Sequence, residues 1–342
     1  MNKKTVDTEN QKLLKIWTDR SNLKPKFNDT KIVKGTSIST PFLAPSLFSP
    51  KHFKFKKDVC ELLILGLNPS YSLGGWKGIF SALNPKALKK RSPQLNSLVK
   101  TANKNGIKQR HIDSYFKYNN HKASKKRYLN DIPDLEYTAF KKHVYFNKVR
   151  ELAKVILEPK NSNWTHLDLY QYRKTNQNDL KTLASHPGNV CFFEKQLGVT
   201  NRIIEQLKPK IILVVNAYAG IVFRRMVHPI QPKFLSNISS KCLILKTVRL
   251  ATDLTETQEK IIKKKGLIKL SKDQIEDCHL KDFHGQTFDK KIGAYKIKIG
   301  GKNQVSRVFF SGMLSGQRAL DLSTFERLKW HVSAVKKGKT MK

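Results

Sequence analysis

Apolar runs of strand length alternate with amphipathic segments along the middle of the chain. The runs are ELLILGL (residues 61–67), WTHLDLY (164–170) and KIILVVN (210–216), while residues 145–157 and 192–207 repeat apolar positions at helical spacing. A strand that is buried on both faces shows a continuous apolar run of this kind. The alternation predicts βαβ units, and hence a parallel sheet with helices on both faces and a ligand site beyond the carboxyl ends of its strands.

The C-terminal part has a different pattern, with short β-like pieces in place of long runs. AYKIKI and QVSRVFF flank Gly300 and Gly301 and predict a hairpin. Residues 308–311 predict a last core strand, which is followed by the turn GMLSG and by a helix over residues 317–335. The pattern therefore predicts a three-layer α/β/α sandwich around a mainly parallel, four-stranded sheet.

Other segments flank or interrupt this domain, which we place at residues 58–335. Residues 1–57 have weak periodicity and predict an irregular basic arm, whose charges either face solvent or contact phosphates. Residues 84–143 are very basic and predict a helix or two. A β-rich insertion is expected at about residues 224–304, and a basic tail at residues 336–342.

Charge changes the picture most. The chain has 66 Lys+Arg against 26 Asp+Glu, a formal net charge of +40 at pH 7. Lysine can accumulate through genome composition, but glutamate then normally accumulates with it, and acids are few here. Such an excess indicates a polyanionic partner, and we expect nucleic acid ahead of ribosomal or anionic-membrane association.

Membrane, metal and cofactor sites are not predicted. The longest apolar runs are far shorter than a membrane span, and the N-terminus MNKKTVDTENQK lacks the apolar core of a signal peptide, so a cytoplasmic, nucleoid-associated monomer is expected. The cysteines are scattered without a CxxC pair, which gives neither zinc nor an iron–sulfur cluster its ligand spacing. We interpret them as reduced and mostly buried thiols: Cys60, Cys191, Cys242 and Cys278.

Four motifs in this order resemble those of the uracil-DNA glycosylase superfamily. They span most of residues 60–335, apart from the insertion. The GxNP motif after the first strand is similar to the water-activating motif of the mismatch-specific and single-strand-selective branches. The motifs are GLNPS (66–70), HLDLYQYRKTNQND (166–179), EQLKPKIILVVNAYAG (205–220) and FFSGMLSG (309–316).

The resemblance implies hydrolysis of the bond between a flipped, damaged or modified base and deoxyribose in DNA. Departure of the base leaves an oxocarbenium-like sugar, so a water has to be positioned and the leaving base hydrogen-bonded. The carboxamide of Asn68 can accept a hydrogen bond from that water, although an amide is a poor base. The alternative is that Asn68-Pro69 is only a strand-ending turn.

Base recognition is implied at two further places. Phe80, or Trp76 in its stead, corresponds to an aromatic that stacks on the flipped base, and each could equally be a core aromatic. Asp168 stands where the family has a base-reading asparagine. An ionised aspartate only accepts hydrogen bonds, which puts uracil in doubt, and Asp168 could instead form a salt bridge with Arg173.

The last loop departs from the family pattern because SGMLSG lacks the expected histidine, which in the family donates to the base. His331, His166 and His186 are uncertain substitutes. Met313 and Leu314 fit a wedge that fills the gap left by a flipped nucleotide, although Leu314 could equally be a core residue.

The resemblance thus assigns three sets of residues. The catalytic set is Asn68 and Ser311. The base-binding set is Gly66, Leu67, Pro69, Tyr71, Phe80, Asp168 and Arg173. The DNA-binding set is Ser70, Asn216, Gly312, Met313, Leu314, Ser315 and Arg318.

Two functions from different classes remain open. The first is a monofunctional DNA glycosylase. The second is a nucleic-acid-binding protein that keeps the fold without the chemistry, which the missing histidine and the aspartate at the reading position favour. Ribosome association is a weaker third possibility, because a charge of +40 needs no active site to be useful.

Overall fold

The computed structural model describes the following residues: 1–18, 42–55, 59–69, 71–83, 92–104, 106–157, 163–174, 177–185, 189–227, 287–289, 294–298, 305–314, 325–326, 328–329 and 332–333. They fall into two compact units, which we treat separately. The helical unit comprises Met1–Phe53, Asn68–Val144 and Asp168–Ile203. The sheet unit comprises Lys54–Leu67, Tyr145–Leu167 and Ile204–Lys342.

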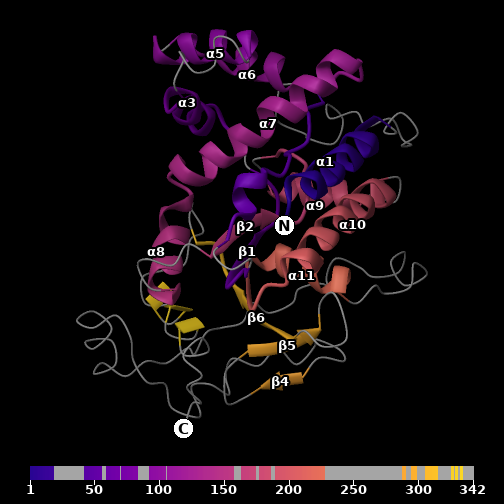
Figure 1. Ribbon diagram of the computed structural model, residues 1–342, viewed down its shortest axis with the longest axis vertical. Coiled ribbons are helices and arrows are strands. Elements are labelled where there is room, and N and C mark those ends of the chain that lie inside the picture. The colour runs from indigo at the N-terminus through magenta and orange to yellow at the C-terminus, as the bar shows by residue number, and fades with distance from the viewer. Residues whose placement is uncertain are drawn as a thin grey trace. The chain divides into compact units, whose positions relative to one another are not determined.

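The sheet has the strand order β2-β1-β3-β6-β5-β4 (Figure 1). The first four strands in that order form a parallel sheet, which confirms the predicted core. β5 pairs antiparallel with β6, as the predicted hairpin requires, and β4 pairs with β5, so the sheet extends beyond four strands. The bounds are β1 Leu62–Gly66, β2 Trp164–Asp168, β3 Ile211–Val215, β4 Thr287–Asp289, β5 Ala294–Lys298 and β6 Val305–Ser311.

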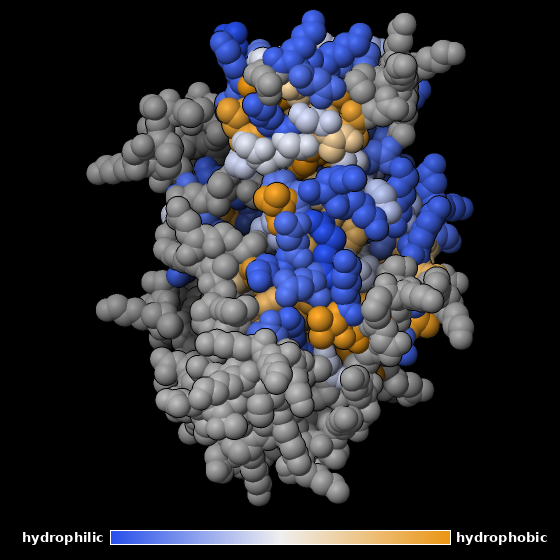
Figure 2. All heavy atoms as spheres, turned by 90° about the vertical axis from the view of Figure 1, so that its left-hand side faces the viewer, coloured by the Kyte–Doolittle hydropathy of each residue, from blue (hydrophilic) through white to orange (hydrophobic). Residues whose placement is uncertain are grey.

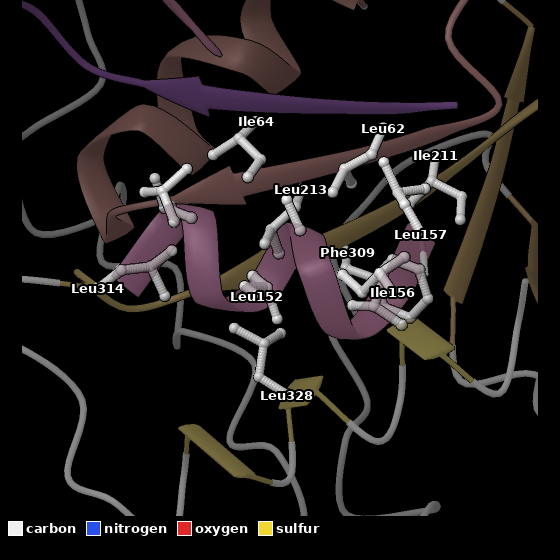
Figure 3. Close-up of a cluster of buried hydrophobic side chains, with 14 of the residues drawn as sticks. Leu62, Ile64, Leu152, Ile156, Leu157, Ile211, Leu213, Phe309, Leu314 and Leu328 are labelled. Atoms are coloured by element: carbon white, nitrogen blue, oxygen red, sulfur yellow. The ribbon is translucent and has the colours of Figure 1, made fainter. Parts of the chain in front are cut away.

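Helices of the sheet unit cover both faces of the sheet. On one face α8 (Phe146–Leu157) packs against β1, β3 and β6 in a cluster that includes Phe309 (Figure 3). The next residue along β6, Phe310, points to the other face. There it meets Phe223 of α11 (Ala217–Val227), with a ring-centroid distance of 6.2 Å. Alternation along β6 thus separates two apolar layers, and the unit is a three-layer α/β/α sandwich.

The cluster beneath α8 consists of aliphatic and phenylalanine side chains that are almost fully buried. Burying each of the larger side chains stabilises the fold by roughly 1.5–3 kcal/mol relative to exposure. The helical pieces near the C-terminus contribute to the same cluster. Its members are Leu62, Ile64, Val149, Leu152, Ala153, Ile156, Leu157, Ile211, Leu213, Val215, Phe309, Leu314, Phe325, Leu328 and Val332.

The helical unit has more helices than the sequence pattern indicated. The described part of the basic stretch 84–143 contains three helices, where the sequence predicted one or two, and the segment GGWKGIF lies in a further helix. Its elements are α1 Lys3–Thr18, η2 Pro50–Phe53, α3 Leu73–Ser81, α5 Pro93–Asn103, α6 Gln109–Phe116, α7 Lys122–Lys142 and α9 Gln177–Ser185. The predicted helix at 192–207 is confirmed as α10, Val190–Leu207.

The prediction of an irregular arm over residues 1–57 is wrong at residues 3–18, because α1 is a 16-residue helix packed into the helical unit, while residues 19–41 lie outside the described chain. Val6 and Trp17 are both buried, and the indole Nε1 of Trp17 donates to a backbone carbonyl. The Asn10 carboxamide makes two hydrogen bonds of 2.8 Å to the backbone of Phe48. A small number of apolar residues, spaced so that they share one face of the helix, pack α1 against the rest of the unit.

The cysteines, a membrane span and the insertion were also addressed by the sequence analysis. Within the described chain Cys60 is buried, whereas Cys191 is exposed, so the expectation of mostly buried thiols holds for one of the two. None of the described helices is long and apolar enough to span a membrane. Most of the insertion expected at 224–304 lies outside the described residues.

Candidate functional site

The strand order places a topological switch point between β1 and β3. The chain passes from β1 to β2 on one side, and β3 then pairs with β1 on the other side. The register aligns Leu65 with Val214, so the loops that follow these two strands begin next to each other at the carboxyl edge. In open α/β sheets, ligands bind at such a point. The loops begin with Leu67, which leads directly into Asn68, and with Asn216.

Asn68 joins the loop after β1 to the segment after β2. Its amide nitrogen Nδ2 lies 2.6 Å from the carbonyl oxygen of Lys174, and 3.2 Å from those of Tyr172 and Pro69. The backbone N–H of Lys174 donates in return to the carbonyl of Pro69, at 3.2 Å. All of these residues belong to the helical unit. We call this arrangement the Asn68 clamp.

The clamp fixes which way the amide points. Only the nitrogen of a carboxamide can face three carbonyl oxygens, because the side-chain oxygen would be repelled by them. The oxygen Oδ1 of Asn68 therefore faces away from the clamp, and no described residue donates a hydrogen bond to it. Asn68 is partly exposed. The arrangement can hold a water as an acceptor, which is the role the sequence predicts.

Arg173 was predicted to bind the base, and the structure contradicts this. Its side chain is 0% exposed. Nε donates to the carbonyl of Ala44 at 3.1 Å, and Nη2 donates to the carbonyl of Pro45 at 3.4 Å and forms an ion pair with Glu136. The guanidinium thus ties the segment before η2 and helix α7 to the segment after β2. These contacts hold in place the segment that carries Tyr172 and Lys174, two acceptors of the Asn68 clamp.

The aromatic residues expected to stack on a base surround this guanidinium or lie behind it. The Arg173 guanidinium carbon lies 4.5 Å from the ring centre of Phe116 and 5.2 Å from that of Trp76. Phe80 packs against Trp76 and Tyr115 and is 0% exposed. A wholly buried ring offers no face to a base, so the core interpretation holds for Phe80 and the stacking prediction is wrong.

Asp168 ends β2, and its environment changes the earlier argument about its charge. Burial, and then the negative charge of Glu136, raise the pKa of the Asp168 carboxyl to about 8, although the positive charge of Arg173 opposes them. The carboxyl is therefore largely protonated at neutral pH. A protonated carboxyl offers one donor and one acceptor, as an asparagine amide does. The raised pKa favours a form of Asp168 that can donate as well as accept, in contrast to the ionised form expected from the sequence.

The other predicted base-binding residues support the loop. The Tyr71 hydroxyl donates to Oδ1 of Asp113 at 2.6 Å, and burial together with this carboxylate raises the pKa of the phenol. Leu67 and Pro69 are buried, as is Gly66, the last residue of β1. Their contribution is to place Asn68, and their side chains are not presented to a ligand.

Asn216, predicted to contact DNA, is the N-cap of α11. Its Oδ1 accepts from the backbone N–H of Tyr218 at 2.8 Å and of Ala219 at 3.3 Å. Its own N–H donates to the carbonyl of Ser311 at 2.9 Å, which links the ends of β3 and β6. With φ at 130°, Asn216 adopts a conformation that few non-glycine residues take. The side-chain oxygen is occupied by the cap, so the DNA-contact prediction gains no support.

The start of the last loop is part of the core. Leu314 is 2% exposed and lies in the cluster beneath α8 (Figure 3), so the wedge prediction is wrong and the core alternative is correct. Ser311 is 1% exposed, which removes it from contact with a substrate in this conformation. Gly312 and Met313 are partly exposed. Three predicted residues lie outside the described part of the chain: Ser70, Ser315 and Arg318.

His166 does not replace the missing loop histidine. It lies within β2, packed against Phe146 with a ring-centroid distance of 5.0 Å, and burial lowers its pKa to about 3. A neutral, buried imidazole on a core strand is a structural group. His186 and His331 lie outside the described residues.

Sequence reasoning missed the partners of the clamp and of Arg173. The clamp acceptors are backbone carbonyls, which every residue type has, so the sequence does not identify them. Glu136 is one of several acids within a basic stretch, and nothing in the sequence pairs it with Arg173. Comparison of the chain with protein-family models, curated proteins and solved structures finds no match. The resemblance therefore rests on the sequence motifs, and function has to be argued from the geometry of Asn68 and its surroundings.

Proposed function

We propose that the protein is a DNA glycosylase that hydrolyses the N-glycosidic bond of a flipped, damaged or modified base. The observation that carries the proposal is the Asn68 clamp, because it presents a fixed carboxamide oxygen at the carboxyl end of β1. Together with the net charge of +40, it supports an activity on nucleic acid.

In the proposed reaction the bond between the sugar C1′ and the base nitrogen breaks, and its electron pair leaves with the base. A water held by Oδ1 of Asn68 adds to C1′ and loses a proton to solvent. An amide positions this water without taking its proton, so its effect comes from orientation. This suits a transition state in which the base has largely departed before the water attacks.

We assign the other half of the reaction to the carboxyl of Asp168, whose raised pKa favours the protonated form. Its O–H can donate to the leaving base while negative charge develops there, which is the task that the absent loop histidine would otherwise perform. Its carbonyl oxygen can accept from a base N–H. A neutral acid therefore reads an edge with one donor and one acceptor, and uracil-like bases are again acceptable substrates.

A screen of substrates tests the proposal. Purified protein is incubated with single- and double-stranded oligonucleotides that contain uracil, hydroxymethyluracil, hypoxanthine or hypermodified bases, and abasic sites are then cleaved with alkali. The proposal expects strand cleavage with at least one modified base and none with unmodified DNA. Absence of abasic sites with every substrate would contradict it.

The second candidate is a nucleic-acid-binding protein that does not cleave. It is favoured by the burial of Phe80, Ser311 and Leu314, because three of the residues assigned to chemistry or base flipping are inaccessible. Salt-dependent DNA binding without any abasic product would select this candidate.

A further inference from the structure

The basic side chains of α5, α6 and α7 are more numerous and more exposed than the acidic ones. Residues 92–143 include eleven Lys or Arg and four Asp or Glu. Even if every acid cancelled one base, an excess of seven positive charges would remain on this segment. The acids are less exposed than the bases, because Asp131 is buried and the other three acids are partly buried, whereas nine of the bases are exposed.

Each of the four acids has a partner inside the helical unit. Asp113 accepts from Tyr71, and Asp131 accepts from Ser92 at 2.5 Å and from Tyr115 at 3.0 Å.

Two of these acids form ion pairs with bases from other parts of the helical unit. Asp134 pairs with Lys51 at 2.9 Å, and Glu136 pairs with Arg173. These carboxylates are occupied in holding the unit together, which leaves them poorly placed to neutralise the basic surface.

The basic side chains of the same helices are on the outside. None of the exposed basic side chains forms an ion pair with a described residue. Hydrogen bonds of Arg127 connect the three helices that carry them. Arg127 of α7 donates to the side chain of Gln94 in α5 at 2.5 Å and to the carbonyl of Tyr115 in α6 at 3.3 Å. The exposed members are Lys100, Lys104, Lys108, Arg110, Lys117, Lys122, Lys126, Lys141 and Lys142.

The surface also lacks the apolar side chains that membrane binding needs. The large hydrophobic side chains that are exposed in the described chain are Leu73, Val144, Val155 and Val305, and none of them belongs to α5, α6 or α7. A membrane-surface helix inserts an apolar face beside its basic one. Figure 2 shows hydrophilic side chains at the top of the view, where Figure 1 labels α5 and α6, with some hydrophobic side chains below them.

We propose that α5, α6 and the N-terminal half of α7 form a docking surface for the phosphate backbone of duplex DNA. The choice of DNA as the polyanion rests on the proposed function, whereas the surface itself rests on the excess of exposed basic side chains. Lysine and arginine contacts to phosphates release condensed counterions, so binding here is independent of base sequence and weakens steeply with salt.

Two matched triple variants test the surface. The first is Lys100→Glu with Lys108→Glu and Lys126→Glu, one change at each of the three helices. The control is Lys4→Glu with Lys154→Glu and Lys195→Glu, exposed lysines of α1, α8 and α10. Both triples change the net charge by the same amount. Circular dichroism and melting temperature establish that each is folded.

Affinity for an unmodified duplex is measured over a series of salt concentrations. The surface triple should bind on the order of 10²-fold more weakly at about 0.1 M salt, with a salt slope shallower by about 3, since each lost phosphate contact removes about 0.9 from the slope. The control triple should keep the wild-type slope.

The outcomes separate this inference from the proposed function. Equal losses in the two triples would overturn the surface, because charge would then act diffusely. A wild-type protein that binds no duplex DNA would overturn the surface, while excision from single-stranded substrates would still support the glycosylase proposal. A wild-type protein that prefers duplex RNA would overturn the choice of DNA. DNA binding and base excision are measured separately. A protein that binds DNA but excises no base would refute the glycosylase proposal, and the two triple variants would still test the surface.

Discussion

The cluster beneath α8 and the surroundings of Arg173 are both buried, but different forces hold them. The first is an aliphatic and aromatic layer that needs only volume and hydrophobicity. The second encloses a guanidinium whose charge is balanced by Glu136 and whose rings and carbonyl partners come from distant segments. Apolar packing tolerates many substitutions of similar volume. A buried charge tolerates almost none, because a missing partner leaves it desolvated and unpaired.

Breaking the Arg173–Glu136 pair should have the largest effect on stability. Glu136→Gln keeps the shape of the side chain but leaves the buried guanidinium uncompensated, and we expect a loss of about 3–5 kcal/mol in the free energy of unfolding. Chemical denaturation measures it. The control is Glu194→Gln at an exposed position of α10, which should change stability by about 0.5 kcal/mol or less. Similar losses in the two variants would show that the pair is not an essential support.

Shortening Leu314 probes the apolar region in the same way. Leu314→Ala opens a cavity in the cluster beneath α8 and should cost roughly 2–5 kcal/mol. If the protein excises bases, the loss of folded protein should lower activity on single and double strands alike. A variant of unchanged stability that loses activity only on duplexes would restore the wedge interpretation.

The sequence predicted the apolar region well and the polar interior poorly. Continuous apolar runs located β1 and β3, and helical spacing located α8, because burial on a regular element leaves a periodic pattern. Arg173 and Glu136 lie 37 positions apart and share no pattern. A glycine-flanked turn suggested that Leu314 is exposed, yet tertiary packing folds it inward.

The same contrast applies to the site. The motif GLNPS identified Asn68 as the residue that presents an amide, but the clamp that orients it uses carbonyls of residues more than 100 positions away. Backbone acceptors are common to all residue types, so only the fold can reveal them. The raised pKa of Asp168 likewise results from burial and from Glu136, neither of which the sequence shows.

The pH dependence of stability tests the neutral state of Asp168. Its pKa in the folded protein, about 8, is above the ordinary value of 3.8 for an aspartate, so unfolding releases a proton and the free energy of unfolding falls as pH rises between these values. Asp168→Asn removes this titration. Over that range, the free energy of unfolding of the variant relative to that of the wild type should rise by at most about 1.4 kcal/mol per pH unit.

Other titrating groups cancel in this comparison, because both proteins contain them. His166 titrates at lower pH and has the opposite sign, since its pKa is lowered to about 3. A stability difference between wild type and Asp168→Asn that does not change between pH 5 and pH 8 would mean that Asp168 is ionised in the folded protein.

The most direct test of the central claim is the single-turnover excision rate of Asn68→Ala on the best substrate from the screen. The control is Asn10→Ala, which also removes a carboxamide bonded to backbone but lies in α1. Both rates are measured below both melting temperatures, because each variant loses hydrogen bonds. The account predicts a fall on the order of 10²-fold or more for Asn68→Ala and little change for Asn10→Ala. Equal rates for Asn68→Ala and the wild type would contradict it.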